Sequence, residues 1–190
     1  MTVVGHPAFW LALLASFSAL TGVGLTLAYA LIPDPPTYHR TPFMEFALPH
    51  GFVCDQEGTE TVCQPSGQGP HPAIIIFAAK LRSSTDEDSL DAYLAHLRTP
   101  RNMRTPDGES YVSEVRHAKS TQLGQRVWAD GLHLGSEIQG YYTRYLGTVT
   151  AHLGIVITYS VHSDHYEHFD AAFRDSITNL VTQQRVSAFD

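Results

Sequence analysis

The pattern of apolar and polar positions divides the chain into an uncharged leading segment and a longer segment of mixed character. Residues 8–32 read AFWLALLASFSALTGVGLTLAYALI and contain no Asp, Glu, Lys or Arg. A helix of this length rises about 37 Å, which is enough to cross a hydrocarbon layer of about 30 Å. Pro7 suits the first turn of such a helix, and Pro33 would end it. The pattern therefore predicts a transmembrane helix over residues 8–32, after an N-terminal flank of residues 1–7.

A cleaved signal peptide is the alternative interpretation of this segment, because Ala28, Tyr29 and Ala30 fit a small-x-small cleavage site. The apolar run is longer than a signal core of about 7–15 residues, and no Lys or Arg precedes it, so the anchor is favoured. Small residues spaced four apart would let a second membrane helix approach closely, although small residues are common in membrane helices in general. The predicted helix-partner face consists of Ser18, Gly22, Thr26 and Ala30.

After a Pro-rich spacer over residues 33–42, the periodicity becomes that of a folded domain, predicted over residues 43–185 and followed by a tail of residues 186–190. Helical spacing of apolar residues follows the cap-like Ser84 and appears again after Ser163. Residues 98–110 are predicted as an exposed loop, and Gly147 as a β-bulge. The predicted strands are residues 43–48, a hairpin around the cysteines, 73–79, 111–118, 125–134, 139–151 and 152–161. Runs of strands with two segregated helices predict an α+β domain with an antiparallel sheet.

The two cysteines flank a short Gly-containing turn in the sequence FVCDQEGTETVCQ, which is typical of a β-hairpin. Cys54 and Cys63 are predicted to pair across it as a disulfide, and the alternative is two reduced thiols in a cytosolic hairpin. The even count, the close spacing and the predicted anchor favour an oxidising compartment. We therefore expect a single-pass protein of the cell inner membrane, with a cytoplasmic N-terminus and a periplasmic C-terminal domain. The positive-inside rule is nearly silent, because Arg40 is the sole Lys or Arg before Lys80.

Three stretches of the chain resemble the PsbP-like family, which comprises extrinsic photosystem proteins and related bacterial secreted proteins. The three stretches are FALPHGFVC, YYTRYLGTVTAHLGIVITYSV and HSDHYEHFDAAFRDSITNLV. The last of them has Ser176 near its end. The resemblance covers roughly residues 43–183. The resemblance implies an antiparallel sheet with two packed helices, and a non-catalytic accessory or assembly role beside a larger membrane complex. It transfers no catalytic residue. The predicted uncleaved transmembrane helix, in place of a cleaved leader or lipid anchor, is a departure from the family pattern.

The charge balance, 12 basic against 19 acidic residues and a net charge of −7, argues against a nucleic-acid-binding protein. Basic residues cluster once, in the predicted loop, at Arg98, Arg101 and Arg104. The cluster predicts contact with lipid headgroups or an acidic partner, and its alternative is an ordinary solvated loop.

One histidine-rich stretch suggests metal chemistry. His165 and His168 would lie one turn apart on the last helix, with His162 and Asp164 beside them, and imidazole with carboxylate can bind Zn or Cu. The alternative is an ordinary polar helix N-terminus.

The sequence lacks a G-x-S-x-G motif and Gly-rich phosphate loops, so we expect no enzymatic activity. The leading hypothesis is a membrane-anchored accessory subunit of a larger membrane protein complex, photosynthetic or respiratory. Its partners would be other integral membrane subunits, reached through the helix and the outer domain, and the lipid bilayer. The alternative is a membrane-tethered metal- or ligand-binding carrier or sensor, and a weaker third option is a degradative enzyme on the same scaffold.

Overall fold

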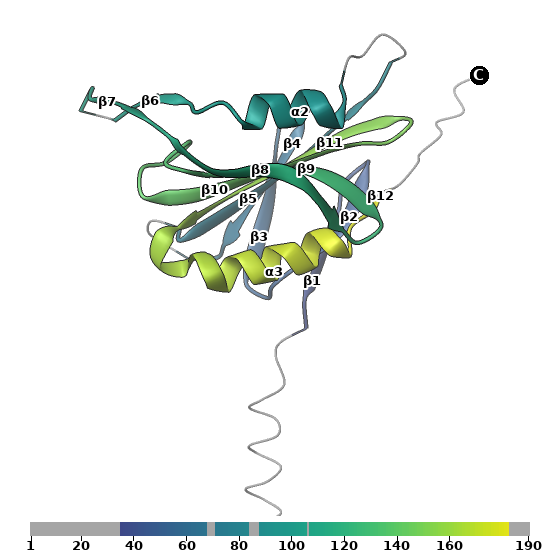
Figure 1. The fold of residues 1–190 in the computed structure, drawn as a ribbon. Coiled ribbons are helices and arrows are strands. Elements are labelled where there is room, and N and C mark those ends of the chain that lie inside the picture. The colour runs from purple at the N-terminus through teal and green to yellow at the C-terminus, as the bar shows by residue number, and fades with distance from the viewer. Residues whose placement is uncertain (1–34, 68–70, 84–87, 106, 183–190) are drawn as a thin grey trace, which may run out of the picture. The chain divides into compact units, whose positions relative to one another are not determined.

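A seven-stranded antiparallel sheet is the main feature of the protein (Figure 1). The computed structural model describes residues 35–67, 71–83, 88–105 and 107–182. The strands of the sheet follow the order β3-β4-β5-β11-β10-β9-β8. Their bounds are β3 Phe52–Glu57, β4 Glu60–Pro65, β5 Ala73–Leu81, β8 Glu114–Leu123, β9 Arg126–Leu134, β10 Tyr141–Val149 and β11 Leu153–His162.

The apolar run in β5 forms an interior strand, as its sequence predicts, with β4 on one side and β11 on the other. Side chains alternate between the two faces of the sheet along each strand. Ile75 and Phe77 are therefore fully buried on one face, whereas Ile74 and Ile76 are partly exposed on the other. The two faces consequently differ in how completely they are covered.

The first face carries the main core. Helix α3 (Tyr166–Thr178) follows a short 3-10 turn, η1 (Ser163–His165), and a three-stranded sheet of order β1-β2-β12 packs on the same face. The strands of that small sheet are β1 Thr37–Arg40, β2 Met44–Leu48 and β12 Val181–Thr182. Phe46 stacks on Phe77 with ring centroids 3.7 Å apart, and Phe52 meets Phe173 of α3 edge to face at 5.6 Å. The helix predicted after Ser163 therefore packs on this face of the sheet.

The second face is covered only in part, by helix α2 (Leu90–Leu97), whose Leu94 and Leu97 pack against Ala129 and Tyr145. This helix lies on β8, β9 and β10, on the opposite side of the sheet from α3 (Figure 1). The predicted helix start at Ser84 lies outside the described residues. The described helix α2 begins at Leu90, where the Ser89 hydroxyl accepts a hydrogen bond from the backbone N–H of Ala92.

Three further predictions about local structure are corrected. The expected loop 98–110 contains strand β6 (Asn102–Arg104), which pairs with β7 (Ser110–Val112) as a small hairpin. The expected spacer 33–42 contains strand β1, which pairs with β2. The sheet register is continuous at Gly147, and the irregularity lies instead between Val115 and His117 on the edge strand β8. A bulge there protects an edge strand against pairing with another chain.

The α+β architecture with an antiparallel sheet and two packed helices is therefore confirmed. Within the described ranges, no helix is long and apolar enough to cross a membrane. The predicted membrane segment 8–32, with its small-residue face Ser18, Gly22, Thr26 and Ala30, lies outside the described residues.

Candidate functional site

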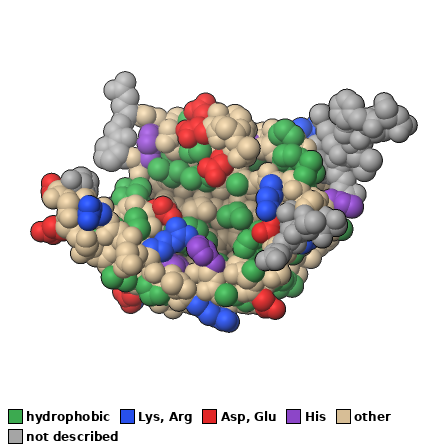
Figure 2. Space-filling model, turned by 90° about the horizontal axis from the view of Figure 1, so that it is seen from above, with side chains coloured by type: hydrophobic (Ala, Val, Ile, Leu, Met, Phe, Trp, Pro, Cys, Tyr) green, Lys and Arg blue, Asp and Glu red, His purple; other side chains and the backbone are tan. Residues whose placement is uncertain are grey.

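The second face of the sheet is hollowed beside α2, and we call this hollow the cleft (Figure 2). It has a volume of about 640 Å³. Its floor consists of alternate side chains of two neighbouring strands: Ile74, Ile76 and Ala78 of β5, and Val156, Thr158 and Ser160 of β11. The floor exists because α2 packs on β8, β9 and β10, whereas these alternate residues lie on β5 and β11. An apolar floor of this size falls within the range of ligand-binding clefts.

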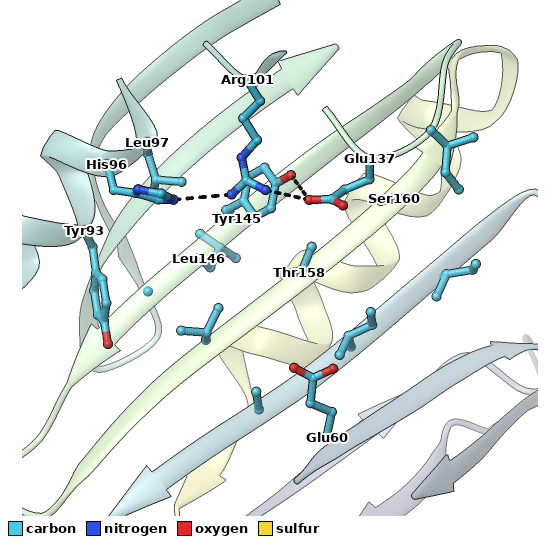
Figure 3. A pocket seen from close by; sticks show the side chains of 16 residues that line it. Glu60, Tyr93, His96, Leu97, Arg101, Glu137, Tyr145, Leu146, Thr158 and Ser160 are labelled. Carbon is cyan, nitrogen blue, oxygen red and sulfur yellow. Dashed lines mark hydrogen bonds and ion pairs between the residues drawn. The ribbon is translucent and has the colours of Figure 1, made fainter. Parts of the chain in front are cut away.

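Beside the floor, a polar cluster forms the wall nearest α2 (Figure 3). The Arg101 Nη1 donates to Glu137 Oε1 at 2.8 Å, and the Tyr145 hydroxyl donates to the same oxygen at 2.5 Å. The Arg101 guanidinium also lies over the Tyr145 ring, 4.5 Å from its centroid, and its Nη2 is 3.5 Å from the His96 Nε2. Burial, followed by the hydrogen bond to Glu137, raises the pKa of Tyr145. The tyrosine is thus a hydrogen-bond donor at any physiological pH.

Tyr93 of α2 lines both the cleft and a second hollow of about 720 Å³, which extends past the end of β5 to residues 41–44. The ring can lie there because Gly147 has no side chain: a Cβ at this position would be 2.7 Å from the Tyr93 Cδ2. Gly147 therefore permits a close approach of α2 rather than a bulge. Gly154 also lies near Tyr93, and a Cβ there would be 3.4 Å from the Tyr93 hydroxyl oxygen.

A buried histidine attaches the end of α2 to the sheet. The Nε2 of His133, on β9, is 2.9 Å from the carbonyl oxygen of Leu97. The His133 side chain is fully buried, and its Nδ1 has no hydrogen-bond partner among the described residues. Burial lowers the pKa of His133, and the nearby positive charge of Arg101 acts in the same direction. The neutral imidazole is therefore the form that the fold favours.

The side of the cleft opposite α2 has one acidic residue, Glu60, and two further carboxylates lie beyond it on the edge strand β3. Asp55 and Glu57 are two residues apart on β3, and Glu57 is the register partner of Glu60 on β4, so the three carboxylates share one face of the hairpin. Glu60 is in turn the partner of Ala78 and lines the cleft. Figure 3 shows the Glu60 carboxylate turned toward the cleft, on the far side from Arg101 and Glu137. We call these three residues, Asp55, Glu57 and Glu60, the acidic edge.

The three predicted basic residues do not act as one exposed cluster. Arg101 is half-buried in the cleft wall, as described above. Arg98 is the C-terminal cap of α2, and Arg104 lies on β6, both with exposed side chains. The predicted contact of this segment with lipid headgroups or an acidic partner stays a prediction.

The predicted metal ligands lie around η1 and the start of α3. The His162 Nδ1 is 3.6 Å from Asp164 Oδ2, and the rings of His162 and His165 are 6.2 Å apart between centroids. His168 instead packs edge to face on Phe169. In the part of the chain that the structure describes, no group of three or more His, Cys, Asp or Glu side chains is positioned to bind a metal ion. The fold does not assemble these four residues into a ready-made site for Zn or Cu.

The predicted disulfide is confirmed. Cys54 and Cys63 are register partners across the β3–β4 hairpin, and they are covalently bonded. The bond lies at the sheet edge that also presents the acidic edge of the cleft.

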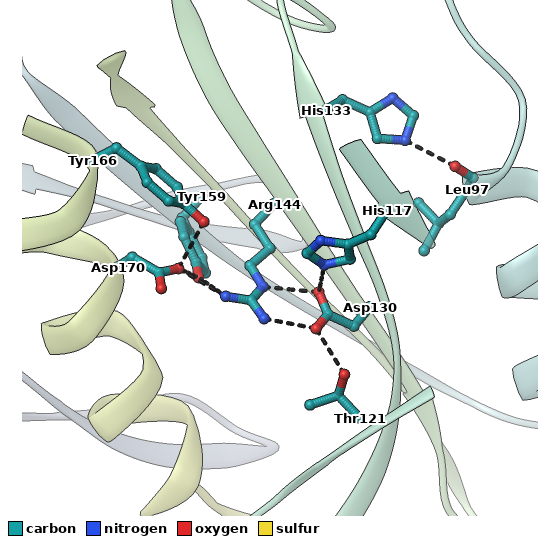
Figure 4. A network of polar contacts seen from close by, with 9 residues as sticks. All are labelled: Leu97, His117, Thr121, Asp130, His133, Arg144, Tyr159, Tyr166 and Asp170. Atoms are coloured by element: carbon teal, nitrogen blue, oxygen red, sulfur yellow. Dashed lines mark hydrogen bonds and ion pairs between the residues drawn. The ribbon is translucent and has the colours of Figure 1, made fainter. Parts of the chain in front are cut away.

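Sequence reasoning missed a buried ionic network between the sheet and α3 (Figure 4). Arg144 of β10 donates to both carboxylate oxygens of Asp130, at 2.8 and 2.6 Å, and to Asp170 Oδ1 on α3 at 2.8 Å. The hydroxyls of Tyr159 and Tyr166 also donate to Asp170. Burial alone would raise the pKa of Asp130, but the hydrogen bonds and the charge of Arg144 outweigh it, so that this pKa is lowered. The one sequence signal was a charged residue within the apolar run YYTRYLGTV.

No protein-family model and no curated protein matches the chain. Among solved structures, cyanobacterial PsbP (CyanoP) from Synechocystis matches with a TM-score of 0.54 and 10% sequence identity, over 80% of this chain and 95% of that one. A protein from Bacteroides thetaiotaomicron matches with a TM-score of 0.52 and 10% identity, over 81% of this chain and 50% of the other, so the match spans half of that protein's length. The yeast Ran-binding protein Mog1p matches with a TM-score of 0.43 and 13% identity, over 74% and 84% of the two chains. The similarity to cyanobacterial PsbP supports a PsbP-like fold and, at 10% identity, shows the fold alone.

Proposed function

We propose that this protein is a non-catalytic accessory subunit of a larger membrane protein complex, and that its cleft is the surface that contacts the partner. The observation that supports this proposal most directly is the mainly apolar cleft floor on β5 and β11. Helix α2 packs on β8, β9 and β10 and leaves this floor open. A concave site of about 640 Å³ with a mainly apolar floor and a few polar groups in its wall is the kind of surface at which proteins bind other molecules. The polar groups of the nearer wall, Arg101 and Glu137, already neutralise each other, as suits a binding wall.

The proposed location follows from the sequence. An uncharged segment over residues 8–32 would anchor the chain in the inner membrane, and the domain would lie on the periplasmic side, where a disulfide is stable. The PsbP-like fold agrees with this role, because the resemblance of the sequence to that family implies an accessory protein beside a membrane complex.

Purification of the full chain in a mild neutral detergent tests the proposal. We expect other membrane proteins to co-elute with it at a fixed stoichiometry. Ile76→Ser should reduce the retained partner at least about tenfold, because it removes apolar surface from the cleft floor. The matched control is Val112→Ser, which changes an apolar side chain that is 62% exposed on β7, away from the cleft floor, and should retain the partner. A lone monomer, or equal retention by both variants, would contradict the proposal.

A second candidate function is the carriage of a small apolar ligand. The volumes of the two hollows, about 640 and 720 Å³, support it, since ligand pockets commonly have about 300–1,000 Å³. Mass spectrometry of the purified chain discriminates the two functions. A bound small molecule that Ile76→Ser removes, in a preparation without a co-eluting protein, would favour the carrier.

A further inference from the structure

We propose that the cleft receives a basic amphipathic helix of the partner protein, with its apolar side chains on the floor and its Lys or Arg side chains beside the acidic edge. This inference rests on the proposed function and names the chemistry of the partner. It follows from the shape of the uncovered face and from the distribution of charge around it.

The shape of the face favours a helix. On the first face, α3 and a small sheet complete the layer over the main sheet, whereas on the second face α2 packs on β8, β9 and β10. The floor side chains of β5 and β11 line one cleft together with Tyr93, His96 and Leu97 of α2, so an occupant of the cleft would lie beside α2 on the same sheet. A helix presents apolar side chains at i, i+3, i+4 and i+7, which is the pattern that fills an apolar groove.

The charge around the cleft favours a cationic helix. The basic side chains at the cleft and the neighbouring hollow are paired, Arg101 with Glu137 at 2.8 Å and Lys80 with Asp88 at 2.6 Å. Within the described ranges, the three carboxylates of the acidic edge form no ion pair. The unpaired charge beside the cleft is therefore negative.

The acidic edge also contains an unfavourable contact that a cation would relieve. Glu57 and Glu60 are directly opposite each other across an antiparallel pair, and like charges in that position repel. Figure 2 shows acidic side chains gathered along one side of the hollow. A Lys or Arg of the partner would reduce this repulsion on binding, whereas an anionic partner such as an acidic helix would increase it.

The test uses the full chain in neutral detergent and two synthetic helical peptides. The peptides share one leucine face, and their flanking positions are all Lys in one and all Glu in the other. Fluorescence anisotropy should give at least about tenfold tighter binding of the Lys peptide at low salt, and the difference should shrink at about 0.5 M salt. The double variant Glu57→Lys with Glu60→Lys should weaken binding of the Lys peptide about tenfold and should tighten binding of the Glu peptide.

The matched control is the double variant Asp107→Lys with Glu109→Lys, which makes the same change in net charge at the β6–β7 turn. It should leave both affinities unchanged within about twofold. Circular dichroism and thermal unfolding establish that each variant is folded before its affinity is compared.

The outcomes separate this inference from the proposed function. If Ile76→Ser weakens binding but charge reversal of the acidic edge does not, the partner helix is not selected by its basic charge, and this inference is overturned while the proposed surface stands. If Ile76→Ser has no effect on either peptide, the cleft is not the binding surface, and both are overturned. If the chain forms a dimer that Ile76→Ser dissociates, the occupant is a second copy, and the inference is again overturned.

Discussion

Arg144 is the side chain that joins the sheet to α3 most directly. Its guanidinium is 4% exposed and contacts a carboxylate on β9 and a carboxylate on α3. Removing one partner of a buried ion pair leaves the other charge desolvated and uncompensated, at a cost of about 3–5 kcal/mol. We therefore expect Arg144→Ala to lower the free energy of unfolding by about that amount in urea denaturation. The control Arg104→Ala, at an exposed position on β6, should change it by less than about 0.5 kcal/mol. Equal effects would show that the network contributes nothing.

His133 should make the stability of the domain depend on pH. Burial lowers its pKa in the folded state below 6.5, so between the two pKa values the unfolded chain binds more protons than the folded one. The contribution of His133 to the unfolding free energy is therefore fully present above pH 6.5, and it is lost as the pH falls below that value. His96 and His117 also lie near it. The positive charge of Arg101 acts in the same direction as burial, whereas the hydrogen bond with the Leu97 carbonyl acts against it.

The variant His133→Gln retains a donor for the carbonyl of Leu97 but cannot titrate. In urea denaturation we expect its unfolding free energy to fall less between pH 7.5 and pH 5.5 than that of the parent chain. The unfolding free energy of this variant will still depend on pH to some extent, because burial also lowers the pKa of His39. The control His152→Gln, at an exposed position, should retain the parent slope. Identical slopes for the parent and His133→Gln would contradict the assignment.

At these single positions, the sequence could predict which residues are buried but not which of them meet. Arg144 is 14 positions from Asp130 and 26 positions from Asp170 in the sequence. Their contact depends on how β9, β10 and α3 are arranged in the fold. The disulfide could be predicted because its two cysteines lie on one local hairpin. The acidic edge was not recognised from the sequence, because it lies beside the cleft only as a result of the pairing of β4 with β5.

At the scale of the elements, the distance between α2 and the sheet depends on Gly131. A Cβ there would be 2.9 Å from the Leu97 Cβ, with both Leu97 methyl carbons at 3.1 Å. Gly131→Ala should therefore displace α2 and lower the free energy of unfolding by about 1–3 kcal/mol. The matched control is Gly154→Ala, where the nearest atom would be 3.4 Å away, and its effect should be small. If urea denaturation gives the same change for both variants, α2 does not pack as tightly as described.

Local periodicity predicted the interior strand and the last helix, because each has a long and regular apolar pattern. It did not single out Ser89, whose hydroxyl caps α2. It also failed at β6 and β7, which have three residues each and no apolar period to detect. Short elements of this kind depend on pairing with each other rather than on their own sequence.

At the scale of the whole molecule, the uneven coverage of the two sheet faces is the property that connects fold to function. The sequence predicted the α+β class from the order of its elements, but not which half of the sheet α2 covers. That arrangement depends on glycines at positions 131 and 147, where the absence of a side chain lets α2 approach β9 and β10. The same arrangement leaves β5 and β11 to form the cleft floor.

The proposed orientation of the chain predicts the redox state of its cysteines in the cell. A disulfide persists in an oxidising compartment and is reduced in the cytosol. Because the Cys63 side chain is fully buried, labelling has to follow rapid denaturation in acid, which also traps the thiols. A thiol-reactive probe should then label neither Cys54 nor Cys63 unless a reductant is added first.

Protease added to cells stripped of their outer barrier provides the independent measurement. We expect it to degrade the C-terminal domain, while a cytoplasmic marker protein stays intact. Labelling of both cysteines without reductant, together with protection of the domain, would place it in the cytosol and contradict the proposed topology. Labelling of neither cysteine with a protected domain would instead indicate a compartment that is oxidising but closed to the protease. The paired measurements thus separate the redox argument from the argument about the membrane anchor.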